Sequence, residues 1–127
     1  MKKFVTLLLC MLPISLFAQV NDGIRQAMDN YDYETVVMLI ESDCQDSLLL
    51  ITKAQALKAM NRYPEAIGVL NSLILKDSTN TKVLIDLAEC YKLTGNSRRA
   101  ANCYQKAMNL QPENKFFRLQ FIRSLLD

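Results

Sequence analysis

The sequence contains no histidine and no tryptophan, and only three glycines and three prolines among its 127 residues. Without histidine, the chain has no imidazole base, no Ser-His or Cys-His nucleophile pair and no His-containing zinc site. Its glycines, Gly23, Gly68 and Gly95, are too scattered to form a phosphate-binding loop of backbone amides. Half of the residues are apolar and 22% are charged, the balance of a soluble globular chain. The scarcity of glycine and proline favours helices.

Residues 1–18 have the order of a secretory signal peptide, with two lysines, an apolar run over residues 4–17 and the small residue Ala18. A helix that crosses a bilayer needs about 20 apolar residues, whereas this run is shorter and Pro13 interrupts it. We therefore expect export and cleavage after Ala18 rather than a stable membrane span.

A lipid anchor is an alternative use of the same segment. It would modify Cys10, but Leu9 stands where a lipoprotein signal has a small residue. The favoured prediction is a periplasmic or secreted chain over residues 19–127, large enough for one small domain.

The charges of the expected mature chain cancel, with 13 bases and 13 acids, but they are unevenly placed. Residues 19–50 hold seven acids and only one base, Arg25, whereas residues 51–127 hold twelve bases and six acids. A net charge of zero argues against binding to nucleic acid or an anionic membrane, despite the adjacent Arg98 and Arg99. The asymmetry is explained by solvated helix faces, by head-to-tail association or by an acidic partner.

Three cysteines remain after cleavage, namely Cys44, Cys90 and Cys103, without the spacing of a metal site. We expect small core residues, with a Cys90–Cys103 disulfide as the alternative, and we expect no metal and no cofactor.

The chain repeats itself with a period of 34 residues. Shifting it by this length superimposes Leu50 on Leu84, Ala54 on Ala88, Lys58 on Lys92, Ala66 on Ala100, and Asn61 on Gly95. The two complete units are residues 47–80 and 81–114.

Within each unit the apolar spacing predicts a helix, a tight turn and a second helix. In residues 81–114 the first stripe ends before Gly95, and Asn96 or Ser97 can cap the second helix. In residues 47–80 the break falls at Asn61, and Pro64 fits an early helical turn.

Small residues mark where the two helices of a unit approach closely. These are Ala54 or Ala88 on the first helix and Ala66 or Ala100 on the second, with bulk supplied beside them by Tyr91 and Tyr104.

The second unit resembles the tetratricopeptide repeat family in its order of residues: Leu84, Leu87, Ala88, Tyr91, Gly95, Ala100, Tyr104, Ala107 and Pro112. Departures are Leu84, where the family often has Trp, and Ser97, where it often has Tyr. The resemblance implies an all-α fold, a right-handed α-solenoid of antiparallel helix pairs. It also implies a non-catalytic scaffold that binds a protein or peptide segment.

The chain beyond the two units follows the same pattern. Residues 19–46 are a degenerate first repeat with an Asp32 cap, and their second helix is expected to be about one turn shorter than in the other repeats. Residues 115–127 form a capping helix or the first helix of a further repeat.

In the family, the first helix of each repeat lines a concave groove. The corresponding residues here, by resemblance, are Leu48, Ile51, Gln55, Lys58, Lys82, Ile85, Glu89, Lys92, Phe116, Leu119 and Arg123. Lys58 and Lys92, one repeat apart, are expected either to hold an acidic group of a partner or to be solvated. The carboxylate clamp of some family members is matched only in part, so that specificity is not carried over.

The last helix has apolar side chains nearly all around. We expect it to contact a partner or a second copy as a homodimer, or else to belong to a longer repeat array that is truncated here.

Three other classes of function compete with the scaffold. An enzyme would use Asp86 and Glu89, but an open groove is a poor place for acid-base catalysis. Polysaccharide binding usually needs exposed aromatic platforms, and the sequence contains no tryptophan. Nucleic-acid binding needs a basic stripe with stacking aromatics, which is not evident in this sequence.

Overall fold

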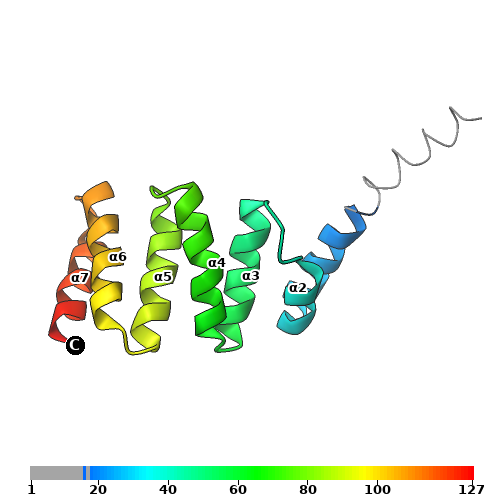
Figure 1. The fold of residues 1–127 in the computed structure, drawn as a ribbon, viewed down its shortest axis with the longest axis horizontal. Coiled ribbons are helices and arrows are strands. Elements are labelled where there is room, and N and C mark those ends of the chain that lie inside the picture. Colours follow the sequence, from blue (N-terminus) through cyan, green and yellow to red (C-terminus); the bar gives the residue numbers. More distant parts are fainter. Residues whose placement is uncertain (1–15, 17) are drawn as a thin grey trace, which may run out of the picture.

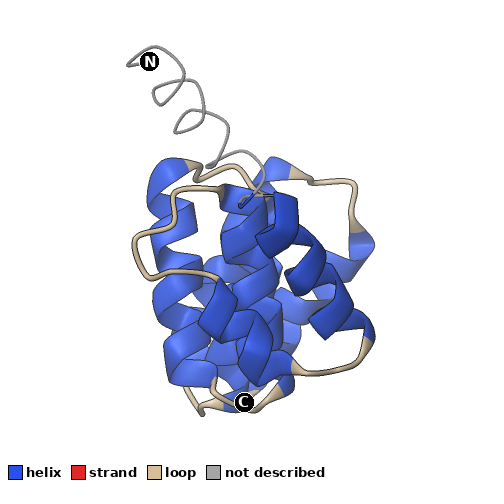
Figure 2. Ribbon diagram, turned by 90° about the vertical axis from the view of Figure 1, so that its right-hand side faces the viewer, coloured by secondary structure: helices blue, strands red, loops and turns tan. Residues whose placement is uncertain are grey.

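The computed structural model describes residue 16 and residues 18–127, and every regular element in this part is a helix. A helix over residues 18–29 is followed by α2 (Tyr33–Leu39), α3 (Ser47–Ala59), α4 (Tyr63–Lys76), α5 (Thr81–Leu93), α6 (Ser97–Leu110) and α7 (Lys115–Leu126). They form a row of antiparallel helices with α2 near one end and α7 at the other (Figure 1). Viewed along the row, they overlap one behind another (Figure 2). The predicted all-helical architecture is confirmed.

The expected signal peptide lies outside the described residues, apart from residues 16 and 18. None of the helices in the described part combines the length and the apolar composition that crossing a bilayer requires.

Short polar side chains cap the free amides of the first turn in five of the helices α2 to α7. The caps, each accepting a hydrogen bond from a backbone amide, are Asp32, Asp46, Asn80, Asn96 and Asn114. The predicted Asp32 cap is confirmed, and of the two candidates for α6 the chain uses Asn96. Before α4, Arg62 makes no such bond, and Pro64 occupies the first turn, where no amide is needed.

The turn inside each helix pair has the same geometry three times along the chain. Tyr31, Asn61 and Gly95 have positive φ angles of 59°, 60° and 79°. The next amide donates to the carbonyl five residues back, in the pairs Asp32–Ala27, Arg62–Leu57 and Asn96–Tyr91, at 2.7 to 2.8 Å. The equivalence of Asn61 and Gly95 is therefore confirmed.

The predicted alanine seams lie in the centre of the core. Ala54, Ala66, Ala88 and Ala100 are at most 1% exposed and share one cluster with Tyr91 and Tyr104. Smaller clusters flank it, one where the 18–29 helix and α2 meet α3, the other where Phe117 of α7 packs beside Leu84 and Ala107. Since each pair of helices buries its apolar face against the next, the core is continuous along the row.

The second helix of the first pair is shorter than the sequence predicts. We expected a loss of about one turn, but α2 has 7 residues where α4 has 14. The chain leaves α2 at the buried, extended Ile40 and crosses to α3 through a longer linker, residues 40–46. Lys53 Nζ holds this linker at the carbonyl of Ile40 (3.2 Å), and Lys76 Nζ holds it at the carbonyl of Gln45 (3.2 Å). The linker contains some of the residues that would otherwise belong to α2. The spacing between apolar residues of successive helices therefore underestimates how much shorter α2 is.

The three cysteines in the described part are free. Cys90 and Cys103 are buried, as expected for small core residues, and burial raises the pKa of both thiols. The alternative of a Cys90–Cys103 disulfide is absent from the structure.

Candidate partner-binding groove

The eleven residues that the sequence assigns to the groove lie on the first helices α3, α5 and α7, and none of them is buried. Leu48, Lys82, Lys92, Phe116, Leu119 and Arg123 are exposed, whereas Ile51, Gln55, Lys58, Ile85 and Glu89 are half-buried. Ile51 and Ile85 also pack against the core. Their role in binding remains a prediction.

Lys58 joins α3 to α5 and is not a free cation. Its Nζ donates to Asp86 Oδ1 at 3.1 Å and to Glu89 Oε2 at 2.8 Å. The side chains of Lys58 and Asp86 are 21% and 18% exposed, so water screens this contact only in part.

The protonation of Lys58 follows from these contacts. Partial burial lowers the pKa of the ammonium group, but hydrogen bonds and charge from Glu89 and Asp86 outweigh it and raise the pKa above its usual 10.5. Lys58 and Lys92, for which the sequence leaves the same two alternatives, therefore differ in their surroundings. Lys58 is occupied within the chain, while Lys92 is exposed and forms no ion pair among the described residues.

Three of the expected residues lie together in one hollow of about 250 Å³. Glu89 and Lys92 come from α5 and Phe116 from α7, and the wall is completed by Leu93, Tyr104 and Gln120. The hollow thus spans two successive repeats, with α6 at its back through Tyr104.

Sequence reasoning missed the last three lining residues as site residues. Gln120 follows Phe116 by four positions, so helical spacing places both on one face of α7 and was a usable signal. Tyr104 belongs to a second helix and had been assigned to packing alone. It is 2% exposed, and burial raises the pKa of its phenol.

Besides the Glu89 carboxylate, which Lys58 engages, the hollow offers two kinds of contact. Phe116 is 51% exposed and presents an apolar ring, while Lys92 presents an ammonium group at the same opening. An extended segment with an apolar side chain next to an acidic one matches this pairing. No group of three or more potential metal-binding side chains occurs within the part of the chain that the structure describes.

The comparison with known sequences identifies the fold family. Residues 57–120 match the sequence profile of the tetratricopeptide repeat. The chain belongs to the tetratricopeptide repeat family. The match runs from the end of α3 into α7 and so includes the hollow.

The chain is also similar to part of a curated protein. The chain is 34% identical over 86 residues to the DnaJ homolog subfamily C member 7 homolog of Dictyostelium discoideum. The match covers 66% of this chain and 16% of that relative, so the chain spans less than a fifth of the relative's length.

Solved structures share the tetratricopeptide repeat architecture. The Arabidopsis OM64 TPR domain is similar with a TM-score of 0.70 at 16% identity, covering 84% of this chain and 92% of that one. The Yersinia enterocolitica type III secretion chaperone SycD, in complex with a peptide of the translocator YopD, is similar with a TM-score of 0.72 at 20% identity. The coverage is 88% of this chain and 94% of SycD. At these identities the likeness shows the fold, which is a helical solenoid.

Proposed function

We propose that the chain is a non-catalytic scaffold that binds a segment of a partner protein in the groove along α3, α5 and α7. The hollow between α5 and α7 carries this proposal, because it places the exposed ring of Phe116 and the exposed ammonium of Lys92 at one opening. The fold supports it as well, since SycD, which has the same architecture, was solved with a peptide of its translocator.

The contacts of Asp86 and Glu89, the alternative catalytic pair, also fit a scaffold. Asp86 and Glu89 both accept hydrogen bonds from Lys58 and so act as a bridge between repeats. A general acid or base would instead need a carboxyl group held ready for a substrate.

Site-specific photocrosslinking tests the groove. A photoreactive amino acid at Phe116 or Gln120 should give a covalent adduct with a partner when the protein is expressed in its own cell. The control position is Leu75 on α4, which is 88% exposed and does not line the hollow. Adducts of equal yield at all three positions would refute a specific groove.

A second variant strengthens this test. Lys92→Glu reverses the charge at the opening without removing an ion pair between described residues. We expect it to reduce the adduct formed from position 120, because the proposed ligand carries an acidic group beside its apolar anchor. An unchanged yield would rule out that ligand chemistry.

We further propose that the protein works after export to the cell envelope. The order of lysines, apolar run and Ala18 in residues 1–18 supports this. Fractionation followed by N-terminal sequencing should find a chain in the envelope or medium that begins at Gln19. A cytosolic protein that keeps residues 1–18 would contradict export.

A further inference from the structure

The C-terminal end of the row exposes an apolar surface on a segment that is rich in bases. α7 packs on α6 through Phe117, while Ile122 and Leu125 remain 48% and 62% exposed. Beside them lies a hollow of about 430 Å³ between α6 and α7. We call this surface the C-terminal face. The residues that line its hollow include Arg98, Ala101, Gln105, Phe121, Leu125 and one acid, Asp127.

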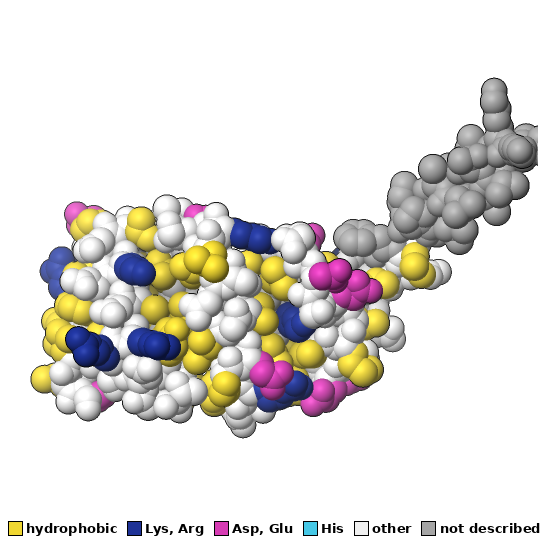
Figure 3. Space-filling model, viewed as in Figure 1, with side chains coloured by type: hydrophobic (Ala, Val, Ile, Leu, Met, Phe, Trp, Pro, Cys, Tyr) yellow, Lys and Arg dark blue, Asp and Glu magenta, His cyan; other side chains and the backbone are white. Residues whose placement is uncertain are grey.

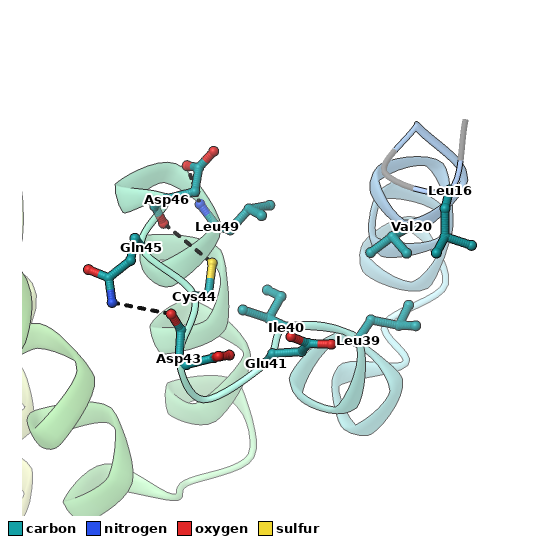
Figure 4. Close-up of a pocket in the computed structure, with 10 residues that line it drawn as sticks. All are labelled: Leu16, Val20, Leu39, Ile40, Glu41, Asp43, Cys44, Gln45, Asp46 and Leu49. Carbon is teal, nitrogen blue, oxygen red and sulfur yellow. Dashed lines mark hydrogen bonds between the residues drawn. The ribbon is translucent and has the colours of Figure 1, made fainter. Parts of the chain in front are cut away.

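The opposite end has a second hollow, of about 510 Å³ (Figure 4). Its apolar residues are Val20 from the 18–29 helix, Leu39 and Ile40 from the end of α2, and Leu49 of α3. Acids at its rim are Glu41, Asp43 and Asp46. We call this surface the N-terminal face. Leu16 also lines it.

The two end segments that carry these faces have opposite net charge. Residues 97–127 hold six bases and two acids, whereas residues 19–46 hold seven acids and one base. Among the described residues, none of those six bases forms an ion pair, and of the seven acids only Glu34 does, with Arg62. Figure 3 shows basic side chains gathered over the α5–α7 end and acidic ones over the end that holds α2. Most of these charges therefore have no oppositely charged partner among the described residues of one chain.

We propose that copies of this chain associate head to tail, the C-terminal face of one copy docking on the N-terminal face of the next. Each face pairs an apolar hollow with flanking charges, and the signs match only between unlike ends. Two C-terminal faces would bring bases against bases, and two N-terminal faces acids against acids, so a symmetric dimer is disfavoured. A contact between unlike faces leaves one free face at each end of the assembly. Further copies can therefore be added, and the product is an open chain of copies. This inference does not depend on the groove.

Light scattering of the purified chain over a dilution series tests the association. The weight-average mass should rise with concentration by about twofold or more and continue past a dimer. It should fall when salt increases from about 0.1 M to about 1 M, because the Debye length shrinks from about 10 Å to about 3 Å. A monomer at every concentration in low salt would overturn the proposal.

Charge reversal identifies the faces. One variant carries Arg98→Glu and Arg118→Glu on the C-terminal side, and the other carries Glu41→Lys and Asp43→Lys on the N-terminal side. All four side chains are exposed and form no ion pair among the described residues, so the fold should survive, as circular dichroism can verify. Asp46 is kept because it caps α3.

The result expected is that each variant alone stays monomeric, while an equimolar mixture assembles again. In the mixture every reversed face meets a face of opposite charge, so both kinds of contact are attractive. The control Leu75→Glu changes the charge at an exposed position of α4 that lines neither hollow, and it should assemble like the unmodified chain. A dimer that persists in both variants, or a mixture that fails to assemble, would overturn the proposal.

Discussion

The ammonium group of Lys58 on α3 lies 2.8 Å from Glu89 Oε2 on α5, across the boundary between two successive repeats. The same nitrogen lies 3.1 Å from Asp86 Oδ1. One cation thus holds two carboxylates of the neighbouring first helix and fixes how the two repeats lie against each other.

Replacing this lysine should destabilise the fold. Lys58→Met keeps the aliphatic stem but leaves Asp86 and Glu89 without their cation, and we expect a loss of about 1 kcal/mol because the contact is partly solvated. Urea denaturation monitored by circular dichroism measures the change. Lys82→Met is the control, since Lys82 is exposed on α5, and it should stay within about 0.5 kcal/mol of the parent. Equal effects of the two changes would contradict the bridge.

The contribution of Lys58 should disappear in strong alkali. Its pKa in the folded chain is raised above 10.5, so the stabilisation is complete below that pH and is lost as the pH rises through the folded pKa. The difference in unfolding free energy between the parent and Lys58→Met should therefore be constant from neutral pH to about pH 10 and shrink above it. A difference that grows with alkaline pH would have the wrong sign for this bridge.

Enlarging the alanine seam should also be costly. Ala100 is fully buried, and Ala100→Leu should lower the free energy of unfolding by about 1 to 3 kcal/mol through overpacking. Asn109→Leu adds leucine at an exposed position of the same helix and serves as the control. Thermal unfolding distinguishes them, and a tolerant Ala100→Leu variant would show that the helices of this pair do not approach closely there.

The start of α6 should depend on one side chain and not on its neighbour. Asn96 accepts a hydrogen bond from the backbone amide of Arg99 at 3.2 Å, so Asn96→Ala should cost about 1 kcal/mol. Ser97 is already the first helical residue, and Ser97→Ala should be nearly neutral. If the serine change proves the more damaging of the two in denaturant titrations, the cap has been misassigned.

Local signals were sufficient to predict the helices and turns of residues 47–114, although not the length of α2. A left-handed turn favours Asn61 or Gly95, a helix start favours Asp32 or Asn96, and these preferences act within a few residues of the chain. The period of 34 residues then makes the helix pair of residues 47–80 equivalent to that of residues 81–114. The buried alanine positions and the overall architecture follow from this equivalence.

The candidate site was predictable only in part. The sequence placed Glu89, Lys92 and Phe116 on first helices, and the structure brings these three into one hollow. It did not reveal that Tyr104 of a second helix forms the wall, nor that Lys58 is engaged by residues 28 and 31 positions away. Periodicity tells which side of a helix a residue occupies, but not which neighbour its side chain reaches.

Tertiary structure also decided how the first repeat absorbs its missing residues. The same reduced spacing fits a slightly shorter helix or a much shorter helix with a longer linker. The second arrangement is adopted, in which Ile40 is buried and Lys53 and Lys76 hold the linker against α3 and α4. The sequence determined the repeat because its signals act between near neighbours. The structure determined the contacts between repeats because burial and ion pairing depend on residues distant in the chain.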